Sequence, residues 1–352
     1  MEEIKEISQM LELMNAPCFC VRDRHIVKTN QDAARLFLRE GMELDPLLST
    51  GVQEYAGFSG GCLYLNLNLG GADIGCSVVR VRNYDIFILE PENESRELQA
   101  LALAAQHLRK PLTGLVTAQE QLRSGLSGDS AVQDQLNQLS RSLAQLQRIV
   151  GNMSDAYGGL SHQEYRDVPA LVREIGEKAQ TLSVYTEAAL TCDVTAEQIS
   201  CLVDAQELER AIWNLLSNAL KFTPRGSSVT LRLFRRGKTL YLQIQDSGSG
   251  IAEAAIGNVF RRFQRQPSLE DSRMGLGLGM ALVRSAAMHH GGTVLIDQPE
   301  GQGTRVTMTL PIPTGSHTVL RSPVLHVDYS GGMDHALLEL SDVLAPEAFA
   351  EI

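Results

Sequence analysis

The chain has 352 residues, of which 43% are hydrophobic, and a formal net charge of −11. This length predicts two or three domains, and the acidic balance excludes the basic surface that nucleic-acid binding requires. No apolar run reaches the roughly 18 residues that span a bilayer. The first ten residues do not resemble a signal peptide, and the six cysteines form no CxxC motif. We therefore expect a reduced, cytoplasmic chain with no nucleic-acid partner and no membrane span.

Residues 1–90 predict a small α/β module, in which helices flank antiparallel strands with alternating side chains. Cys18 and Cys20 fall on one face of the first strand. In the segment 62–70, Tyr64, Asn66 and Asn68 form a polar face opposite a row of leucines. The order of these elements resembles a PAS-type sensory domain. A ligand sensor and a ligand-free packing module are both consistent with this pattern.

Residues 91–160 predict an antiparallel helical hairpin. Residues that are apolar, except for Gln119, recur at alternating spacings of three and four from Leu98 to Leu122. A second apolar series runs from Val132 to Met153. The glycine-containing segment 124–129 separates these two series. One hairpin buries only its facing seam, so we expect a homodimer in which two hairpins close as a four-helix bundle.

The segment 207–223, ELERAIWNLLSNALKFT, predicts a helix with an unusual polar stripe. Asn214, Asn218 and Lys221 are spaced by four and three residues, so they share one side of the helix. Two carboxamides and an ammonium group offer a neutral oxygen to a cation and N–H donors to an anion. This stripe suits a metal–phosphate ligand better than plain water.

Two glycine-bearing segments follow, DSGSGI at 246–251 and GLGLGMALV at 275–283. With the asparagine helix and the segments VFRRFQR, HHGG and EGQGTRVTMTLP, they resemble the nucleotide-binding domain of histidine kinases. That family belongs to the GHKL superfamily of gyrase, Hsp90 and MutL ATPases. The resemblance covers residues 203–311 and implies an α/β-sandwich domain that binds ATP with Mg²⁺. The preceding hairpin resembles the dimerisation and phosphoacceptor region of the same kinases.

The resemblance implies a role for each matching residue. Asn218 corresponds to the magnesium ligand, Asn214 supports the same site, and Lys221 meets the phosphates. Asp246 accepts a hydrogen bond from the adenine amino group. The remaining nucleotide-binding positions implied are Gly248, Gly250, Phe263, Gly275, Gly277 and Gly279. The polar stretch 266–274 suits a lid over the nucleotide.

The phosphoacceptor motif departs from the family pattern. The family has His-Glu-Leu-Arg-x-Pro-Leu, whereas residues 106–112 read QHLRKPL. Gln106 occupies the acceptor position, and the neighbouring His107 is a shifted candidate. One residue turns a helical side chain by about 100°, so His107 is either a displaced acceptor or no acceptor.

A second departure concerns the residue that would activate water for ATP hydrolysis. Relatives that hydrolyse ATP with water carry a glutamate where this helix has Asn214. An amide cannot take a proton at neutral pH, so the site is suited to an acceptor other than water.

The sequence therefore predicts a multidomain α+β protein. Its domains are a PAS-like module (1–90), a dimerisation hairpin (91–160), an ATP-binding domain (161–312) and an extension (313–352). The expected function is that of a sensor histidine kinase, which autophosphorylates on His107 and passes the phosphate to an aspartate of a response-regulator receiver domain. One alternative is a pseudokinase that binds ATP and regulates a partner through its bundle. Another is a serine kinase or anti-sigma-type binder of the same superfamily, which would not need the long hairpin.

The extension has a pattern of its own. Residues 322–329 alternate like an edge strand, and residues 333–344 could form a short helix. Such a segment could dock a partner, but covering a sheet edge is its more ordinary use.

Overall fold

A computed structural model describes residues 2–350 with internal gaps. The gaps are 15, 91–94, 127–129, 156–161, 187, 253–255, 258, 261–276, 300–302 and 315–332. The predicted site residues Phe263 and Gly275, the predicted lid at 266–274 and the predicted strand at 322–329 lie outside the described residues.

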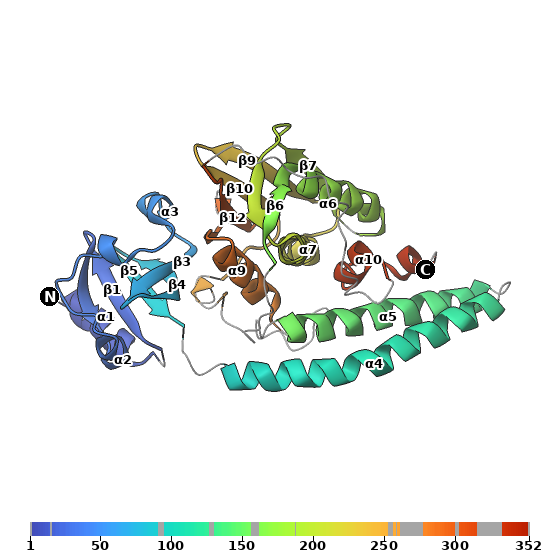
Figure 1. Cartoon of the computed structure of the whole chain (residues 1–352), viewed down its shortest axis with the longest axis horizontal. Helices are drawn as coiled ribbons and strands as arrows, with labels where there is room; N and C mark the ends of the chain where they lie inside the picture. The colour runs from blue at the N-terminus through green and yellow to red at the C-terminus, as the bar shows by residue number, and fades with distance from the viewer. Residues whose placement is uncertain are drawn as a thin grey trace.

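The first unit, residues 2–90, is a sheet with short helices around it (Figure 1). Its elements are α1 (Glu2–Glu12), β1 (Cys18–Arg22), β2 (His25–Thr29), α2 (Gln31–Arg35), η1 (Asp45–Leu47), α3 (Val52–Ala56), β3 (Cys62–Leu69), β4 (Ala72–Val81) and β5 (Tyr84–Leu89). The strands are ordered β2-β1-β5-β4-β3, and every pair is antiparallel. Cys18 and Cys20 pack together on one face against α1, whereas Phe19 faces the opposite core. The predicted alternation along β1 is confirmed.

Two long helices, α4 (Ser95–Gly125) and α5 (Ser130–Asp155), lie side by side (Figure 1). Ala105 and Leu112 of α4 pack against Val150 of α5 in a buried seam. A second row of leucines is between 42% and 54% exposed. This leucine row consists of Leu108, Leu115 and Leu122 on α4 and Leu139 and Leu146 on α5.

The second unit, residues 164–312, packs helices on one mixed sheet. Its elements are β6 (Glu164–Asp167), α6 (Val168–Leu182), η3 (Ser183–Tyr185), β7 (Ala189–Val194), β8 (Ser200–Val203), α7 (Ala205–Phe222), β9 (Ser228–Arg236), β10 (Thr239–Gln245), α9 (Gly279–His289), β11 (Val294–Asp297) and β12 (Arg305–Pro311). Helix α7 begins at an Asp204 cap, whose carboxylate accepts the backbone N–H of Glu207. Leu208, Ile212 and Leu216 of α7 are fully buried in the core beneath the sheet.

One strand of this unit lies outside the ten-stranded sheet. Strand β8 pairs with β6 in a separate two-stranded sheet. This pairing satisfies the backbone of both short strands. It also places Cys201 and Val203 in the core around α7.

The two units share one sheet. Its ten strands run β2-β1-β5-β4-β3-β11-β12-β10-β9-β7, so that β3 of the first unit pairs antiparallel with β11 of the second. Tyr64 of β3 is buried, its ring lies 5.5 Å from that of Phe260, and its hydroxyl donates to the Met288 sulfur at 3.2 Å. The polar face predicted for β3 is therefore covered at Tyr64 and Asn66 instead of facing water.

Residues 333–350 form α10 (His335–Glu339) and η5 (Pro346–Phe349). The segment does not cover a sheet edge as expected, since it packs against α5, α6 and α7 instead. Leu340, Leu344 and Phe349 are fully buried. These apolar side chains are better accommodated between helices than along an exposed strand. Within the described parts of the chain, no helix is both long and apolar enough to cross a membrane.

The junction of the two units depends on close backbone contact at Gly61. This residue has φ +86°, and a Cβ added there would overlap the carbonyl oxygen of Ile296 in β11. Gly71 has φ +91° but no atom within 4 Å of such a Cβ. We expect Gly61→Ala to lower the thermal midpoint more than Gly71→Ala. Both variants strain the backbone by about 1–2 kcal/mol, but only Gly61→Ala also pushes β3 away from β11.

Differential scanning calorimetry and amide hydrogen exchange at residues 294–296 measure this effect. Equal losses of stability in the two variants, with unchanged protection of β11, would show that the junction is not tightly packed.

Candidate functional site

The polar stripe of α7 faces the first turn of α9. Asn214 is only 2% exposed, and its amide nitrogen donates to the Arg210 carbonyl oxygen at 2.9 Å. A Cβ built on Gly279 would lie 2.9 Å from Asn214 Oδ1 and 3.7 Å from Asn218 Nδ2. The two asparagines and Gly279, far apart in sequence, therefore lie close together. A side chain at position 279 would crowd the Asn214 oxygen.

The first turn of α9 lies beside the same two asparagines. Its N-cap residue, Leu278, makes no capping hydrogen bond through its side chain, and Gly277 before it has φ +72°. The leading N–H groups of a helix have no intrahelical acceptors, and the helix dipole makes this end positive. A polyphosphate fits such a position. Leu278 itself is buried against Leu101 of α4 and Met153 of α5.

A buried carboxylate lies at the end of β10. Asp246 is 8% exposed, and its Oδ1 accepts the backbone N–H groups of Gly248 at 2.8 Å and Thr304 at 3.1 Å. Burial raises the pKa of Asp246, and the hydrogen bonds from Gly248 and Thr304 partly offset that rise. The carboxylate is thus fixed in a poorly hydrated position, where an N–H donor from a ligand can replace water.

The loop after Asp246 runs directly beneath the end of α7. A Cβ on Gly248 would overlap the Phe222 carbonyl oxygen, so only glycine permits this approach. Gly250 has φ +75° and lies against the Gln298 side chain, which donates to the Ile251 carbonyl oxygen at 2.7 Å. The loop therefore lies against the C-terminal end of α7, the helix that bears the asparagine stripe.

Comparison with known proteins agrees with this arrangement. Residues 203–314 match the family model of histidine kinase-, DNA gyrase B- and HSP90-like ATPases. Residues 203–314 are an ATPase domain of this family. The match spans α7, the Asp246 loop and the start of α9, which are the parts that border the site.

Three of the similar proteins are named histidine kinases. The chain is 38% identical over 109 residues to histidine protein kinase DivJ of Caulobacter vibrioides, which covers 31% of this chain and 18% of that protein. It is 35% identical over 112 residues to sensor histidine kinase WalK of Bacillus subtilis, and the match covers 31% of this chain and 18% of that protein. It is 30% identical over 182 residues to sensor-like histidine kinase SenX3 of Mycobacterium bovis, and the match covers 50% of this chain and 42% of that protein. The chain thus spans less than half the length of these relatives. The predicted resemblance to sensor histidine kinases is confirmed.

A solved structure resembles the fold over a longer stretch. It is full-length ShkA in complex with AMPPNP, which is 23% identical, with a TM-score of 0.51. The alignment covers 62% of this chain and 47% of that one.

Within the ATPase domain, the predicted site residues fall into two groups. Asn214, Asn218 and Gly279 come together where α7 meets α9, and Gly277 lies two residues before Gly279. Asp246, Gly248 and Gly250 form the loop beneath α7. Lys221 is half-buried near the end of α7, with its ammonium group 5.8 Å from the centre of the Phe222 ring.

The two acceptor candidates, Gln106 and His107, lie outside this constellation. Both are exposed on α4. Leu101 is the α4 residue that contacts Leu278. Six residues later, His107 is about 9 Å further along the helix and about 120° around it. The ring therefore does not lie on the face of α4 that meets α9.

Two histidines at the end of α9 make contacts that join this helix to the start of α7. His290 is buried, its Nε2 accepts the Asp204 backbone N–H at 2.8 Å, and its Nδ1 donates to the Ala286 carbonyl at 2.6 Å. Burial lowers the pKa of His290. His289 pairs with Glu207 at 2.7 Å, and this hydrogen bond raises the pKa of His289. Both contacts hold α9 against the start of α7.

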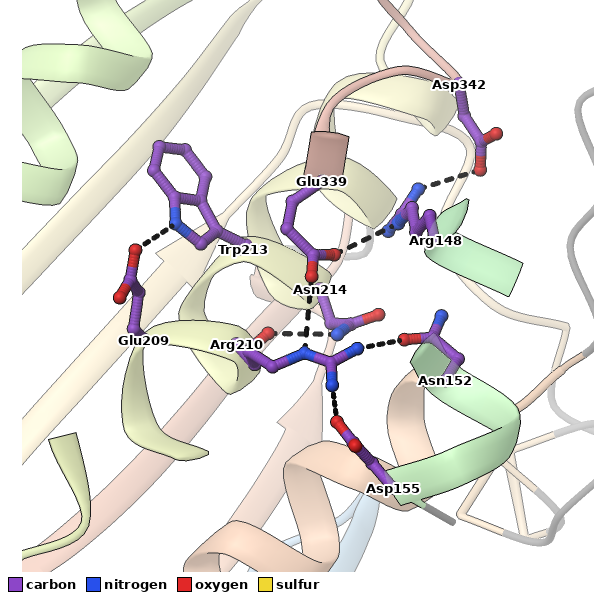
Figure 2. A network of polar contacts seen from close by, with 9 residues as sticks. All are labelled: Arg148, Asn152, Asp155, Glu209, Arg210, Trp213, Asn214, Glu339 and Asp342. Carbon is purple, nitrogen blue, oxygen red and sulfur yellow. Dashed lines mark hydrogen bonds and ion pairs between the residues drawn. The ribbon is translucent and has the colours of Figure 1, made fainter. Parts of the chain in front are cut away.

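Sequence reasoning missed two residues at the site. Thr304, the residue before β12, supports Asp246, but nothing in its local pattern indicates this. Arg210 lies one turn before Asn214, on the same side of α7, and Figure 2 shows its side chain in a network of ion pairs with other helices. The stripe of Asn214, Asn218 and Lys221 extends back to Arg210 by helical spacing. That periodicity was the available signal.

The buried His290 predicts acid sensitivity of this domain. An unfolded histidine has a pKa near 6.5, whereas the folded His290 has a lower one. Below pH 6.5 the unfolded chain therefore binds a proton that the folded chain rejects, and stability falls as the pH decreases. His289 acts in the opposite sense, because its raised pKa favours the folded state at low pH.

We expect His290→Gln to lose less stability than the wild type between pH 7 and pH 5.5, although it is less stable at pH 7. Urea denaturation across this pH range measures the difference. Parallel pH profiles for the two proteins would contradict a neutral, buried His290.

Proposed function

We propose that the chain is a sensor histidine kinase. It binds Mg-ATP between α7 and α9 and transfers the terminal phosphoryl group to His107. From there the phosphate passes to an aspartate of a response-regulator receiver domain. The observation that supports this proposal most strongly is the asparagine stripe of α7, which borders the glycine-opened first turn of α9.

The residues present fit a magnesium-bound nucleotide. Asn218 offers a neutral carboxamide oxygen, a ligand type that Mg²⁺ accepts beside phosphate oxygens. The backbone N–H groups at Gly277 and Gly279 would hold the phosphates, and Lys221 would meet them as a point charge. Asp246 would accept a hydrogen bond from the adenine amino group. The bound Mg²⁺ would neutralise charge on the phosphates.

The same site disfavours hydrolysis. The side chain of Asn214 is an amide held by the Arg210 carbonyl oxygen, so it cannot remove a proton from water. The terminal phosphate is thus kept for another nucleophile. In the proposed transfer, an imidazole nitrogen forms a bond to phosphorus as the bond to the ADP oxygen breaks, and ADP leaves with the electron pair.

A homodimer fits the leucine row defined above. Its five leucines are about half exposed and recur at seven-residue spacing within each helix. A second copy of the helical pair would bury this row in a four-helix bundle. Light scattering tests this. Leu115→Arg should shift the protein from dimer to monomer, and a wild-type monomer at micromolar concentration would contradict the dimer.

The first unit, which we interpret as a PAS-like sensory module, is coupled directly to the ATPase domain. Besides the β3–β11 pairing, Glu90 at the end of the first unit forms an ion pair with Arg284 of α9. Arg284 also donates to the Phe260 carbonyl oxygen at 2.9 Å. A change in the first unit would therefore reach the helix that borders the nucleotide.

Phosphotransfer to His107 is tested with labelled ATP. The full chain, incubated with Mg²⁺ and γ-labelled ATP, should acquire label that is stable in base and labile in acid, as expected of a phosphohistidine. His107→Ala should remove this label. Gln106→Ala, a change at the neighbouring exposed position, should retain it.

Label that survives His107→Ala would exclude His107 as the acceptor. Absence of label in a wild-type protein that binds Mg-ATP would overturn the kinase proposal.

A further inference from the structure

One buried carboxylate joins the helical pair of α4 and α5 to the ATPase domain. Glu339 of α10 is completely buried. Its Oε2 accepts from Arg148 Nε of α5 at 3.1 Å, and its Oε1 accepts from Arg210 Nε of α7 at 3.3 Å. Figure 2 shows the carboxylate between the two guanidinium groups. A single side chain of residues 333–350 thus bridges the helical pair and the ATPase domain.

Neighbouring groups complete this network. Arg148 also pairs with Asp342 at 2.8 Å. Arg210 also donates to Asn152 of α5 at 2.9 Å and forms an ion pair with Asp155 at the end of α5. Both guanidinium groups are nearly buried, with side-chain exposures of 7% for Arg148 and 6% for Arg210. Helix α7 is therefore held to α5 both directly and through Glu339.

The rest of the segment is anchored on both sides. Leu338, Leu340 and Phe349 are buried in the core of the ATPase domain. On the other side, guanidinium groups of the helical pair donate to carbonyl oxygens of the segment. Arg141 reaches the Ser341 carbonyl at 3.2 Å, and Arg123 reaches the Ala350 carbonyl at 3.0 Å.

We propose that residues 333–350 are a latch that holds the ATPase domain docked on α5, with Glu339 as its positioning residue. The latch lies outside the segment 203–314 that matches the ATPase family. It fixes the turn of α7 that contains Arg210 and Asn214, and hence one wall of the nucleotide site, against the helical pair.

A buried ion bridge between Arg148, Glu339 and Arg210 suits a contact between domains that can open. Two guanidinium groups and a carboxylate lose hydration when buried, so such a bridge adds little net stability compared with apolar packing. Loss of the one shared carboxylate leaves both cations less well compensated. The bridge therefore specifies one arrangement of the ATPase domain on the helical pair, and this arrangement opens when the Glu339 carboxylate is removed.

The consequence for activity rests on the proposed function. His107 lies about 120° around α4 from the face that touches Leu278. While the latch is closed, the nucleotide site of the same chain cannot align with that ring. Opening the latch should therefore raise the rate of phosphorylation of His107.

The latch is tested by a distance measurement on the full chain without nucleotide. Spin labels are placed at Gln138 of α5 and Lys178 of α6, both exposed. Burial raises the pKa of native thiols, for example to about 12 for Cys18 and about 11 for Cys201. Labelling of the introduced cysteines is therefore favoured.

We expect a single narrow distance distribution by double electron–electron resonance in the wild type. Glu339→Gln should broaden it and add longer distances. Glu347→Gln is the matched control, since it makes the same change at an exposed position of the same segment and should leave the distribution unchanged. Of the two ion-pair contacts of Glu339, Arg148→Gln removes only the one to α5, and it should also broaden the distribution. This second variant serves as the test if Glu339→Gln folds poorly.

A narrow, wild-type distribution in both Glu339→Gln and Arg148→Gln would overturn the latch. Because this measurement needs neither ATP nor phosphotransfer, its outcome is independent of the kinase proposal. Where phosphorylation of His107 is observed, its initial rate should rise severalfold in Glu339→Gln and stay unchanged in Glu347→Gln. A lower rate in Glu339→Gln would contradict the inhibitory role.

Discussion

The close approach of α7 to the first turn of α9 is the constraint on which the rest of the structure depends. A glycine at position 279 leaves room beside Asn214 and Asn218, and a Cβ there would come within 2.9 Å of the Asn214 oxygen. The buried apolar side of α7 and the His290–Asp204 hydrogen bond keep the two helices in this relation. The space between them is therefore a property of the whole ATPase domain.

Each wall of this space is tied to a different part of the chain. Helix α9 is joined to the first unit through Tyr64–Met288 and Glu90–Arg284. Helix α7 is joined to α5 through Arg210, both directly and by way of Glu339. A rearrangement of either neighbour would change the separation of α7 and α9. The architecture thus connects the proposed nucleotide site to the first unit on one side and to the helical pair on the other.

Local patterns account for what the sequence could predict. The stripe of α7 and the alternation of β1 each depend on a helical or strand period, and each appears as expected. The two apolar series of the predicted hairpin also depend on a helical period. The pairing of β3 with β11 joins strands some 230 residues apart, and such edge-to-edge contact leaves no local period. Glu339 was missed because a charged residue in a short helix is typical of a solvated surface. The burial of Asn214 likewise depends on elements distant in sequence.

Isothermal titration calorimetry with Mg-ATP tests the central claim most directly, because it detects binding between α7 and α9 without requiring catalysis. The wild-type protein should bind with measurable heat. Asn218→Ala should weaken binding at least about tenfold, as expected when one hydrogen-bonded or metal-ligating group of about 1.5–3 kcal/mol is lost. That difference should largely vanish when EDTA removes Mg²⁺, and Asn68→Ala, at an exposed position of the first unit, should behave as wild type. No heat from the wild-type protein, or equal affinity in Asn218→Ala, would contradict the assignment of this site.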